Sequence, residues 1–151
     1  MKEMKADLEI RDYEPKDAEQ ISILMTELGY PNTIDFFRER FDTLLNTGLD
    51  RILVAERGGF ILGIITLHFM PLPHLPGNLC RVVALAVKSD SQRQGVGAKL
   101  MVTAEEIARE KGCSKMELTS GEQRSDAHTF YRAIGFEEKS KRFTKDLTSE
   151  E

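Results

Sequence analysis

The feature that most constrains the fold is a long apolar strand that passes through a glycine-bearing turn straight into a helix. Residues 79–87 are nearly continuous in apolar side chains, which is typical of a central strand covered on both faces. A polar stretch follows, and the segment 92–97, with the sequence QRQGVG, opens an amphipathic helix that the apolar periodicity predicts as far as Lys111. The sequence therefore predicts an α/β protein with helices packed on a sheet.

The turn at 92–97 has the features of an anion-binding site. The first amides of a helix have no acceptor within the helix, and the helix dipole adds partial positive charge at the same end. Gly95 and Gly97 carry no side chains, so an anion can approach the backbone closely. We therefore expect main-chain N–H groups to hold a phosphate or diphosphate here, although two glycines taken alone would equally suit a plain strand-to-helix turn.

Two other phosphate-binding motifs fit this segment less well. A P-loop requires Lys followed by Ser or Thr after its second glycine, whereas Ala98, Lys99 and Leu100 follow here. The dinucleotide fingerprint requires Gly or Ala where this chain has Leu100. It also requires an acidic residue at a strand end about twenty residues later, which the sequence lacks.

The remaining pattern predicts a mixed sheet with helices on both faces, in a single domain of residues 1–151 with its ordered core at 8–147. Two glycines after Arg57 predict a hairpin between two β-rich runs. Gly29, Gly112 and Gly135 each follow a helical pattern that they are expected to end. We expect strands at residues 8–12, 51–56, 60–69, 79–87, 115–119, 136–139 and 142–147, and helices at residues 15–28, 33–45, 96–111 and 125–134.

Composition restricts the functional classes. Of the 151 residues, 40% are hydrophobic and 30% charged, a balance that argues against disorder. The net charge of −4 and the dispersed Lys and Arg residues leave no concentrated basic face for nucleic acid. The apolar stretches are too short to span a membrane and no signal peptide is recognisable, so we expect a cytoplasmic protein without a membrane partner. Cys80 and Cys113 are expected to be reduced, buried thiols without a metal or disulfide.

Two blocks of the sequence closely resemble the GNAT (GCN5-related N-acetyltransferase) superfamily. Its central motif is Gln or Arg, two residues, Gly, one residue, and Gly or Ala, after a strand that ends in Leu-x-Val. Here the segment 92–97 follows Leu85 and Val87. The second block, Ala-x-x-Phe-Tyr-x-x-x-Gly-Phe, begins at Ala127 and is matched without gaps. The order of the predicted elements extends the resemblance over essentially the whole chain.

The resemblance implies a mixed, mostly antiparallel sheet that splays between its fourth and fifth strands, with acetyl-CoA in the opening. Backbone groups of the fourth strand would pair with the pantetheine arm, and amides of the following loop would hold the pyrophosphate. No metal is implied. The cofactor contacts expected on this basis are Leu85, Ala86, Val87, Gln92, Arg93, Gln94, Gly95, Val96, Gly97, Ala98 and Phe130.

The resemblance also implies an enzyme, an N-acetyltransferase in which an amine attacks the thioester directly. Tyr131 is the expected acid that protonates the departing thiolate. Without the resemblance, an aromatic residue beside Phe130 and Ile134 would be interpreted as part of the core. Many members carry a Glu general base two residues before the position of Leu85, where this chain has Val83. A base that acts through water, or an amine that arrives partly neutral, is therefore required.

The expected acceptor is a primary amine of a small molecule, because the strings 27–31 and 124–128 resemble a bacterial subgroup that includes aminoalkylphosphonate-type enzymes. If the rate shows a basic group independent of the amine, His74 or Glu122 is the expected base. Acetylation of protein N-termini or lysines, a non-catalytic acyl-CoA-binding regulatory role, and a homodimer stay open. The candidate acceptor residues are Tyr30, His68, His74, Glu122 and Arg124, each of which also suits a solvated loop or strand edge.

Overall fold

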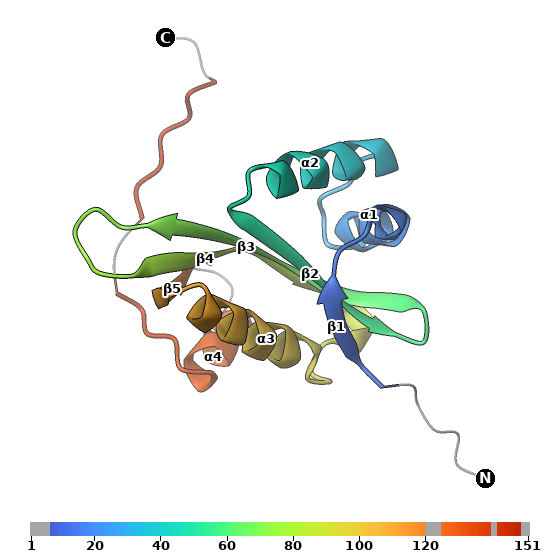
Figure 1. Ribbon diagram of the computed structural model, residues 1–151. Coiled ribbons are helices and arrows are strands. Elements are labelled where there is room, and N and C mark those ends of the chain that lie inside the picture. Colours follow the sequence, from blue (N-terminus) through green and yellow to red (C-terminus); the bar gives the residue numbers. More distant parts are fainter. Residues whose placement is uncertain (1–6, 120–124, 140–141, 149–151) are drawn as a thin grey trace. The chain divides into compact units, whose positions relative to one another are not determined.

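The computed structural model describes residues 7–119, 125–139 and 142–148 (Figure 1). The chain forms two compact units, Met1–Thr119 and Ser120–Glu151, so the single-domain organisation stays a prediction. In chain order the described elements are β1 (Glu9–Asp12), η1 (Pro15–Asp17), α1 (Ala18–Glu27), α2 (Ile34–Asn46), β2 (Asp50–Arg57), β3 (Phe60–Pro71), β4 (Asn78–Val87), η2 (Ser89–Ser91), α3 (Val96–Glu110), β5 (Cys113–Leu118) and α4 (Ser125–Ala133).

The sheet of the first unit has the strand order β1-β2-β3-β4-β5. Every neighbouring pair is antiparallel except β4 and β5, which are parallel and are joined by α3, the crossover that a parallel pair requires. The predicted hairpin joins β2 to β3 through Gly58 and Gly59, which both have positive φ. Helices α1 and α2 cover one face of the sheet and α3 covers the other (Figure 1). The predicted mixed α/β fold is confirmed.

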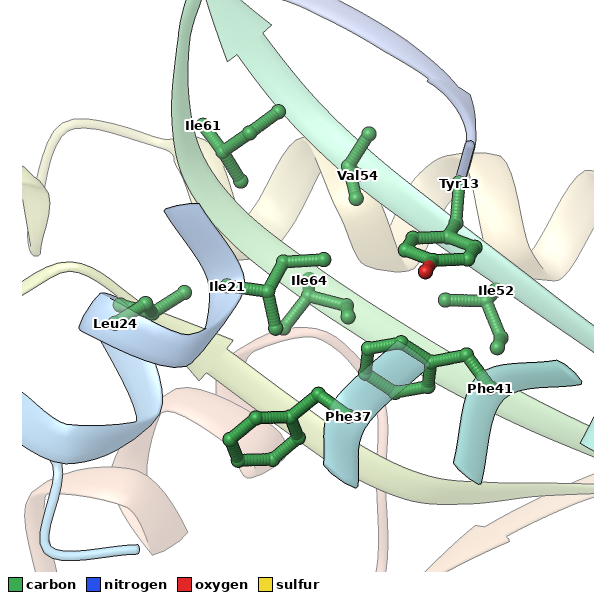
Figure 2. Close-up of a cluster of buried hydrophobic side chains, with 9 residues drawn as sticks. All are labelled: Tyr13, Ile21, Leu24, Phe37, Phe41, Ile52, Val54, Ile61 and Ile64. Atoms are coloured by element: carbon green, nitrogen blue, oxygen red, sulfur yellow. The ribbon is translucent and has the colours of Figure 1, made fainter. Parts of the chain in front are cut away.

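The sheet face that carries α1 and α2 is closed by a cluster of buried apolar side chains (Figure 2). Ile21 and Leu24 lie three residues apart on α1, and Phe37 and Phe41 four apart on α2, so each helix turns one stripe to the sheet. The Thr33 hydroxyl accepts a hydrogen bond from the amide of residue 36, which starts α2 where the sequence predicts it. The strands and the β1–η1 turn complete the cluster with Tyr13, Ile52, Val54, Ile61 and Ile64.

On the opposite face, α3 packs close to the backbone of β3. Val96 and Leu100 are buried on the inner side of α3. A Cβ atom placed on Gly63 would lie 3.1 Å from Val96 Cγ1, from Leu100 Cδ1 and from the carbonyl oxygen of Ala86. The glycine therefore permits the close approach of the first turns of α3, and of the loop that precedes them.

The second unit contains α4, which ends as the sequence predicts. Gly135 has a φ of 101°, and its amide donates to the carbonyl oxygen of Arg132 at 3.1 Å. The amide of Phe136 donates to the carbonyl oxygen of Tyr131 at 2.9 Å. This pair of bonds satisfies carbonyl groups of the last helical turn, as a left-handed glycine after a helix allows.

The prediction of strands at 136–139 and 142–147 is wrong. The structure describes these residues, and none of them forms a strand. A strand is stable only when its backbone is paired and one of its faces is buried. Phe143 and Leu147 are 91% and 87% exposed, so the apolar residues of the second segment bury no face.

Candidate active site

β4 continues beyond its pairing with β5. The parallel register starts at Asn78 opposite Cys113 and ends at Val82 opposite Leu118, whereas β4 reaches Val87. Residues 83–87 are paired with β3 on one side and have no strand partner on the other within the described part of the chain. The predicted opening between the fourth and fifth strands is present. It leaves a strip of strand backbone with which an extended ligand can pair.

The hydrogen-bond pattern shows which residues turn their backbone groups to this open edge. The amide of Lys88 donates to the carbonyl oxygen of Leu62 on β3 at 2.8 Å. In an antiparallel pair, residues that bond to the neighbouring strand alternate with residues whose N–H and C=O groups point away from it. Leu85 and Val87 therefore present their backbone groups to the open edge, whereas those of Ala86 face β3.

Val83 marks the point where β4 changes its register. Thr66 lies opposite Ala84, and Leu67 lies opposite Val82, so Val83 has no partner on β3 and forms a bulge. Its side chain is 61% exposed. The prediction of a strand covered on both faces therefore fails here, because the bulge coincides with the end of the pairing to β5.

The loop after β4 brings unpaired amides to the start of α3. Gly95 precedes the helix with a φ of 84°, and a left-handed residue beside a right-handed one turns successive N–H groups to one side, which forms an anion-binding nest. The first bond of α3 runs from the Lys99 amide to the Gly95 carbonyl at 3.0 Å, so the amides of residues 96–98 have no acceptor within the helix. The first turn of α3 contains no acidic side chain to compete for them.

Side chains of the loop fix its shape. Gln92 Nε2 donates to the carbonyl oxygen of Val87 at 3.2 Å, and Gln94 Nε2 donates to that of Asp90 at 3.1 Å. Arg93 adopts a φ of 65°, which strains a residue other than glycine and therefore requires such support. The sequence motif identified Gln92 without explaining it, and the structure shows that its amide ties the loop back to β4.

A carboxylate of α1 secures the other end of the loop. The hydroxyl of Ser89 hydrogen-bonds to Glu27 Oε1, which also accepts the Ser89 amide at 3.2 Å. Ser91 is buried, and its amide donates to the carbonyl oxygen of Lys88 at 2.9 Å. The loop is thus held by β4, by α1 and by its own η2 turn.

Cys80 is buried as expected, whereas Cys113 is only partly buried. Cys80 is buried in β4, and burial raises the pKa of its thiol to about 12. Burial also raises the pKa of Cys113, which is partly buried in β5. Both side chains are therefore thiols rather than nucleophilic thiolates at neutral pH. The described residues contain no group of three or more His, Cys, Asp or Glu side chains that could hold a metal ion.

The candidate acceptor residues lie on separate segments. Tyr30 is 71% exposed between α1 and α2, and His74 is exposed in the connection between β3 and β4. His68 lies on β3, and its Nδ1 is 2.9 Å from Asp50 Oδ1 on β2. Glu122 and Arg124 lie outside the described residues.

The candidate acid lies in the second unit. Tyr131 is partly buried on α4, with ring centroids 5.5 Å from Phe130 and 6.1 Å from Phe136. The ring is therefore packed within its own unit, and its assignment as an acid, like that of Phe130 as a cofactor contact, remains a proposal.

Sequence reasoning did not identify Asp50 as a functional residue. Asp50 is the first residue of β2 and carries no motif, and only the register that places it opposite His68 reveals the pair. A polar histidine within an otherwise apolar strand was the one feature of the sequence that indicated the Asp50–His68 pair.

Comparison with known proteins identifies the family. The sequence profile of the acetyltransferase (GNAT) family matches residues 18–136. The chain belongs to the GNAT acetyltransferase family. It is 32% identical over 141 residues to the aminoalkylphosphonate N-acetyltransferase of Salmonella typhimurium, an alignment that covers 92% of this chain and 91% of the relative. The GNAT chain described here is thus an acyltransferase of a family that uses acetyl-CoA.

Two solved acetyltransferase structures share the architecture. A Trypanosoma brucei acetyltransferase superposes with a TM-score of 0.80 at 25% identity, covering 93% of this chain and all of the other. An aminoglycoside N-acetyltransferase solved in complex with CoA superposes with a TM-score of 0.84, covering 99% of this chain and all of the other, and at 15% identity it shows the fold alone. No described helix of the chain is long and apolar enough to cross a membrane.

Proposed function

We propose that this GNAT chain transfers the acetyl group of acetyl-CoA to a primary amine of a small molecule. The observation that carries the proposal is the continuity of two binding surfaces. The open backbone edge of β4 leads directly into the unpaired amides at the start of α3. An extended amide-containing arm that ends in a diphosphate matches this sequence of surfaces in both shape and charge.

The residues present fit acetyl-CoA. Backbone groups of Leu85 and Val87, which face the open edge, would pair with the pantetheine arm, and amides from Arg93 to Ala98 would hold the pyrophosphate. Gln92 holds the loop against β4. Ala86 lies on β4 between Leu85 and Val87, and its small side chain leaves room beside them. Phe130 of α4 is the apolar contact that we propose for the cofactor. No residue of the site needs a metal ion for these contacts.

The chain contributes positioning and proton transfer to the reaction. Acetyl-CoA supplies an activated acyl group on sulfur. The β4 edge fixes the position of that group, so the amine meets it in a constrained geometry. An amide on the open edge donates to the developing negative charge on oxygen. Tyr131 donates a proton to the sulfur that leaves, and the amine loses a proton to a base.

The acceptor that we propose is an amine that also carries an anionic group. The relative from Salmonella typhimurium is named for aminoalkylphosphonates and aligns over nearly the whole chain. Arg124 is the proposed partner of the anionic group because a guanidinium pairs with phosphonate oxygens through two parallel hydrogen bonds. Tyr30 and His74 belong to the proposed acceptor site.

Release of CoA thiol tests this function across a set of amines. The set includes an aminoalkylphosphonate, the matching alkylamine without phosphonate, an aminoglycoside, and peptides with a free N-terminus or a lysine. We expect the aminoalkylphosphonate to have the highest kcat/KM. A preference for peptides would support protein acetylation instead. Tight acetyl-CoA binding by calorimetry without turnover of any amine would support a non-catalytic acyl-CoA-binding role.

A further inference from the structure

A row of four polar side chains crosses the sheet at the level where β4 and β5 are still paired. The register places Asp50 of β2 opposite His68 of β3, His68 opposite Arg81 of β4, and Arg81 opposite Glu117 of β5. Residues opposite each other in neighbouring strands point to the same face, so all four share one face. His68 is four residues beyond Ile64, which packs against α1 and α2, so the row lies on that same face.

Asp50 is held in a fixed orientation. Its side chain is only 7% exposed. One carboxylate oxygen, Oδ1, is 2.9 Å from His68 Nδ1, and the other contacts the hydroxyl of Thr47, which also accepts a hydrogen bond from the Leu49 amide at 3.0 Å. Both oxygens are therefore within hydrogen-bonding reach of a neighbouring side chain.

This contact decides which nitrogen of His68 is basic. An ionised carboxylate only accepts hydrogen bonds, so Nδ1 carries the proton in the contact with Asp50. The lone pair of the neutral ring is then on Nε2, which has no hydrogen-bond partner among the described residues. The His68 side chain is 30% exposed, so the basic nitrogen belongs to a ring that solvent and small molecules can reach.

The other charged groups of the row do not compete for the histidine. Arg81 is paired with Glu117, with its Nε 2.9 Å from Glu117 Oε1. Asp50 is thus the one charged side chain of the row that bonds to the imidazole among the described residues. Arg81 lies opposite His68 on β4, and its charge is balanced by Glu117.

His68 also lies next to the open edge of β4. It is opposite Arg81, and the bulge at Val83 and the end of the β4–β5 pairing follow within two residues. The amide of Leu85 lies four residues beyond Arg81, about 13 Å along an extended strand. The small side chains of Ala84 and Ala86 face the same side of β4 along this interval. This distance is too long for direct proton transfer, so a proton exchanged between this region and His68 would have to pass through water.

We infer that His68 is the general base of the acetyl transfer and that Asp50 is its positioning residue. The inference rests on the proposed function. His68 would supply the base that is missing at Val83. It takes the place of His74 and Glu122, the two bases expected from the sequence. The nitrogen of the amine forms a bond to the acetyl carbon while the carbon–sulfur bond breaks. One proton leaves the nitrogen through water for His68 Nε2, and the leaving sulfur receives a proton from the acid, so charge and atoms balance.

Kinetics of three variants test the inference against a matched control. We expect His68→Asn to lower kcat by about 10²-fold or more, while acetyl-CoA affinity by calorimetry stays near that of wild type. We expect Asp50→Asn to lower kcat by about tenfold or more, because an amide in place of the carboxylate favours the wrong tautomer of the ring. Imidazole added to His68→Ala should restore part of the rate. Asp12→Asn makes the same chemical change at the exposed Asp12–Arg51 pair of the neighbouring strands and should leave kcat unchanged.

The pH profile of the wild-type protein provides a test that does not depend on a folded variant. With two amines of different pKa, a base on the protein gives an ascending limb of kcat/KM at the same pH for both. A profile that moves entirely with the pKa of the amine would overturn the inference. So would a folded His68→Asn variant with wild-type kcat. Acetyl-CoA binding without acetylation of any amine contradicts the proposed function, whereas amine acetylation that does not depend on His68 contradicts this inference alone.

Discussion

Gly63 of β3 lies against Val96, the first residue of α3, so closely that a Cβ atom on Gly63 would be 3.1 Å from Val96 Cγ1. The same added atom would be 3.1 Å from the carbonyl oxygen of Ala86 on β4. The glycine therefore sets the distance between the strip of β4 backbone and the helix whose amides are proposed to hold the pyrophosphate. A residue without contact to any ligand thus determines the geometry of the site.

The first prediction is that Gly63→Ala destabilises the protein and weakens acetyl-CoA binding. Neither strand backbone nor buried α3 side chains can yield freely, so we expect a loss of about 1–3 kcal/mol in the free energy of unfolding, measured with urea. Calorimetry should show weaker acetyl-CoA binding, because α3 moves outward. Gly59→Asn is the control: nothing lies within 4 Å of its added Cβ, and Asn tolerates its positive φ. Equal stability of the Gly63→Ala variant and wild type would contradict the packing argument.

The second prediction concerns the anion nest itself. Gly97→Leu places a bulky side chain among the amides of residues 96–98, and we expect acetyl-CoA affinity to fall by at least roughly tenfold, or about 1.4 kcal/mol. Val102→Leu enlarges an exposed side chain further along the same helix and should leave the affinity unchanged. Wild type should gain thermal stability from acetyl-CoA, because a ligand that binds the folded state raises its stability. Equal affinities in Gly97→Leu and wild type would place the pyrophosphate elsewhere.

The sequence predicted the strand, the glycine turn and the helix start between Leu79 and Ala98 because each is specified locally, although it missed the exposed Val83. An apolar run specifies a central strand, and glycines before a helix specify the turn whatever the rest of the chain does. The pair of Asp50 and His68 could not be predicted in the same way. Eighteen residues separate them, and only the register of β2 on β3 brings them together.

Two further features show the same limit. The left-handed Arg93 was not expected, because sequence patterns assign such conformations to glycine. The strands expected at 136–139 and 142–147 are likewise absent from the described residues of these segments. A short segment of sequence does not specify a partner strand, and the apolar residues Phe143 and Leu147 are exposed. Local preferences thus predicted elements, whereas long-range pairing decided which of them form and which side chains meet.

The third prediction is an acid-dependent loss of stability through Asp17. Burial alone would raise the pKa of its carboxyl group, but two hydrogen bonds of 2.8 Å from Arg11 and one from the Glu14 amide hold the pKa below its ordinary value. A lowered folded-state pKa stabilises the protein above the unfolded pKa of about 3.9, and this contribution is lost as the pH falls below it.

Urea unfolding as a function of pH measures this contribution. Asp17→Asn should lose about 1–3 kcal/mol at neutral pH, and its stability should then fall less steeply than that of wild type as the pH drops below about 4. Asp35→Asn, which alters an exposed pair with Arg38 on α2, should stay close to wild type, because exposed pairs contribute little. Parallel acid limbs in wild type and Asp17→Asn would show that another carboxylate is responsible.

The fourth prediction concerns Tyr131. A phenol is protonated at neutral pH and can donate to a leaving thiolate. Tyr131→Phe removes only the hydroxyl, and the ring contacts with Phe130 and Phe136 within the second unit keep the aromatic side chain in place. If Tyr131 is the acid, turnover falls by roughly 10²-fold or more while acetyl-CoA affinity and melting temperature stay near those of wild type.

The rate must be measured where chemistry limits turnover, because slow product release would hide the loss. Single-turnover mixing of the acetyl-CoA complex with saturating amine meets this condition. An acetyl-donor thioester with a more acidic thiol provides the decisive comparison, since a better leaving group needs less protonation. We expect the Tyr131→Phe variant to recover much of its lost rate with that donor, whereas a defect in packing would slow both donors equally. A folded variant with wild-type single-turnover rates on acetyl-CoA would leave positioning by β4 and α3 as the main source of the rate enhancement.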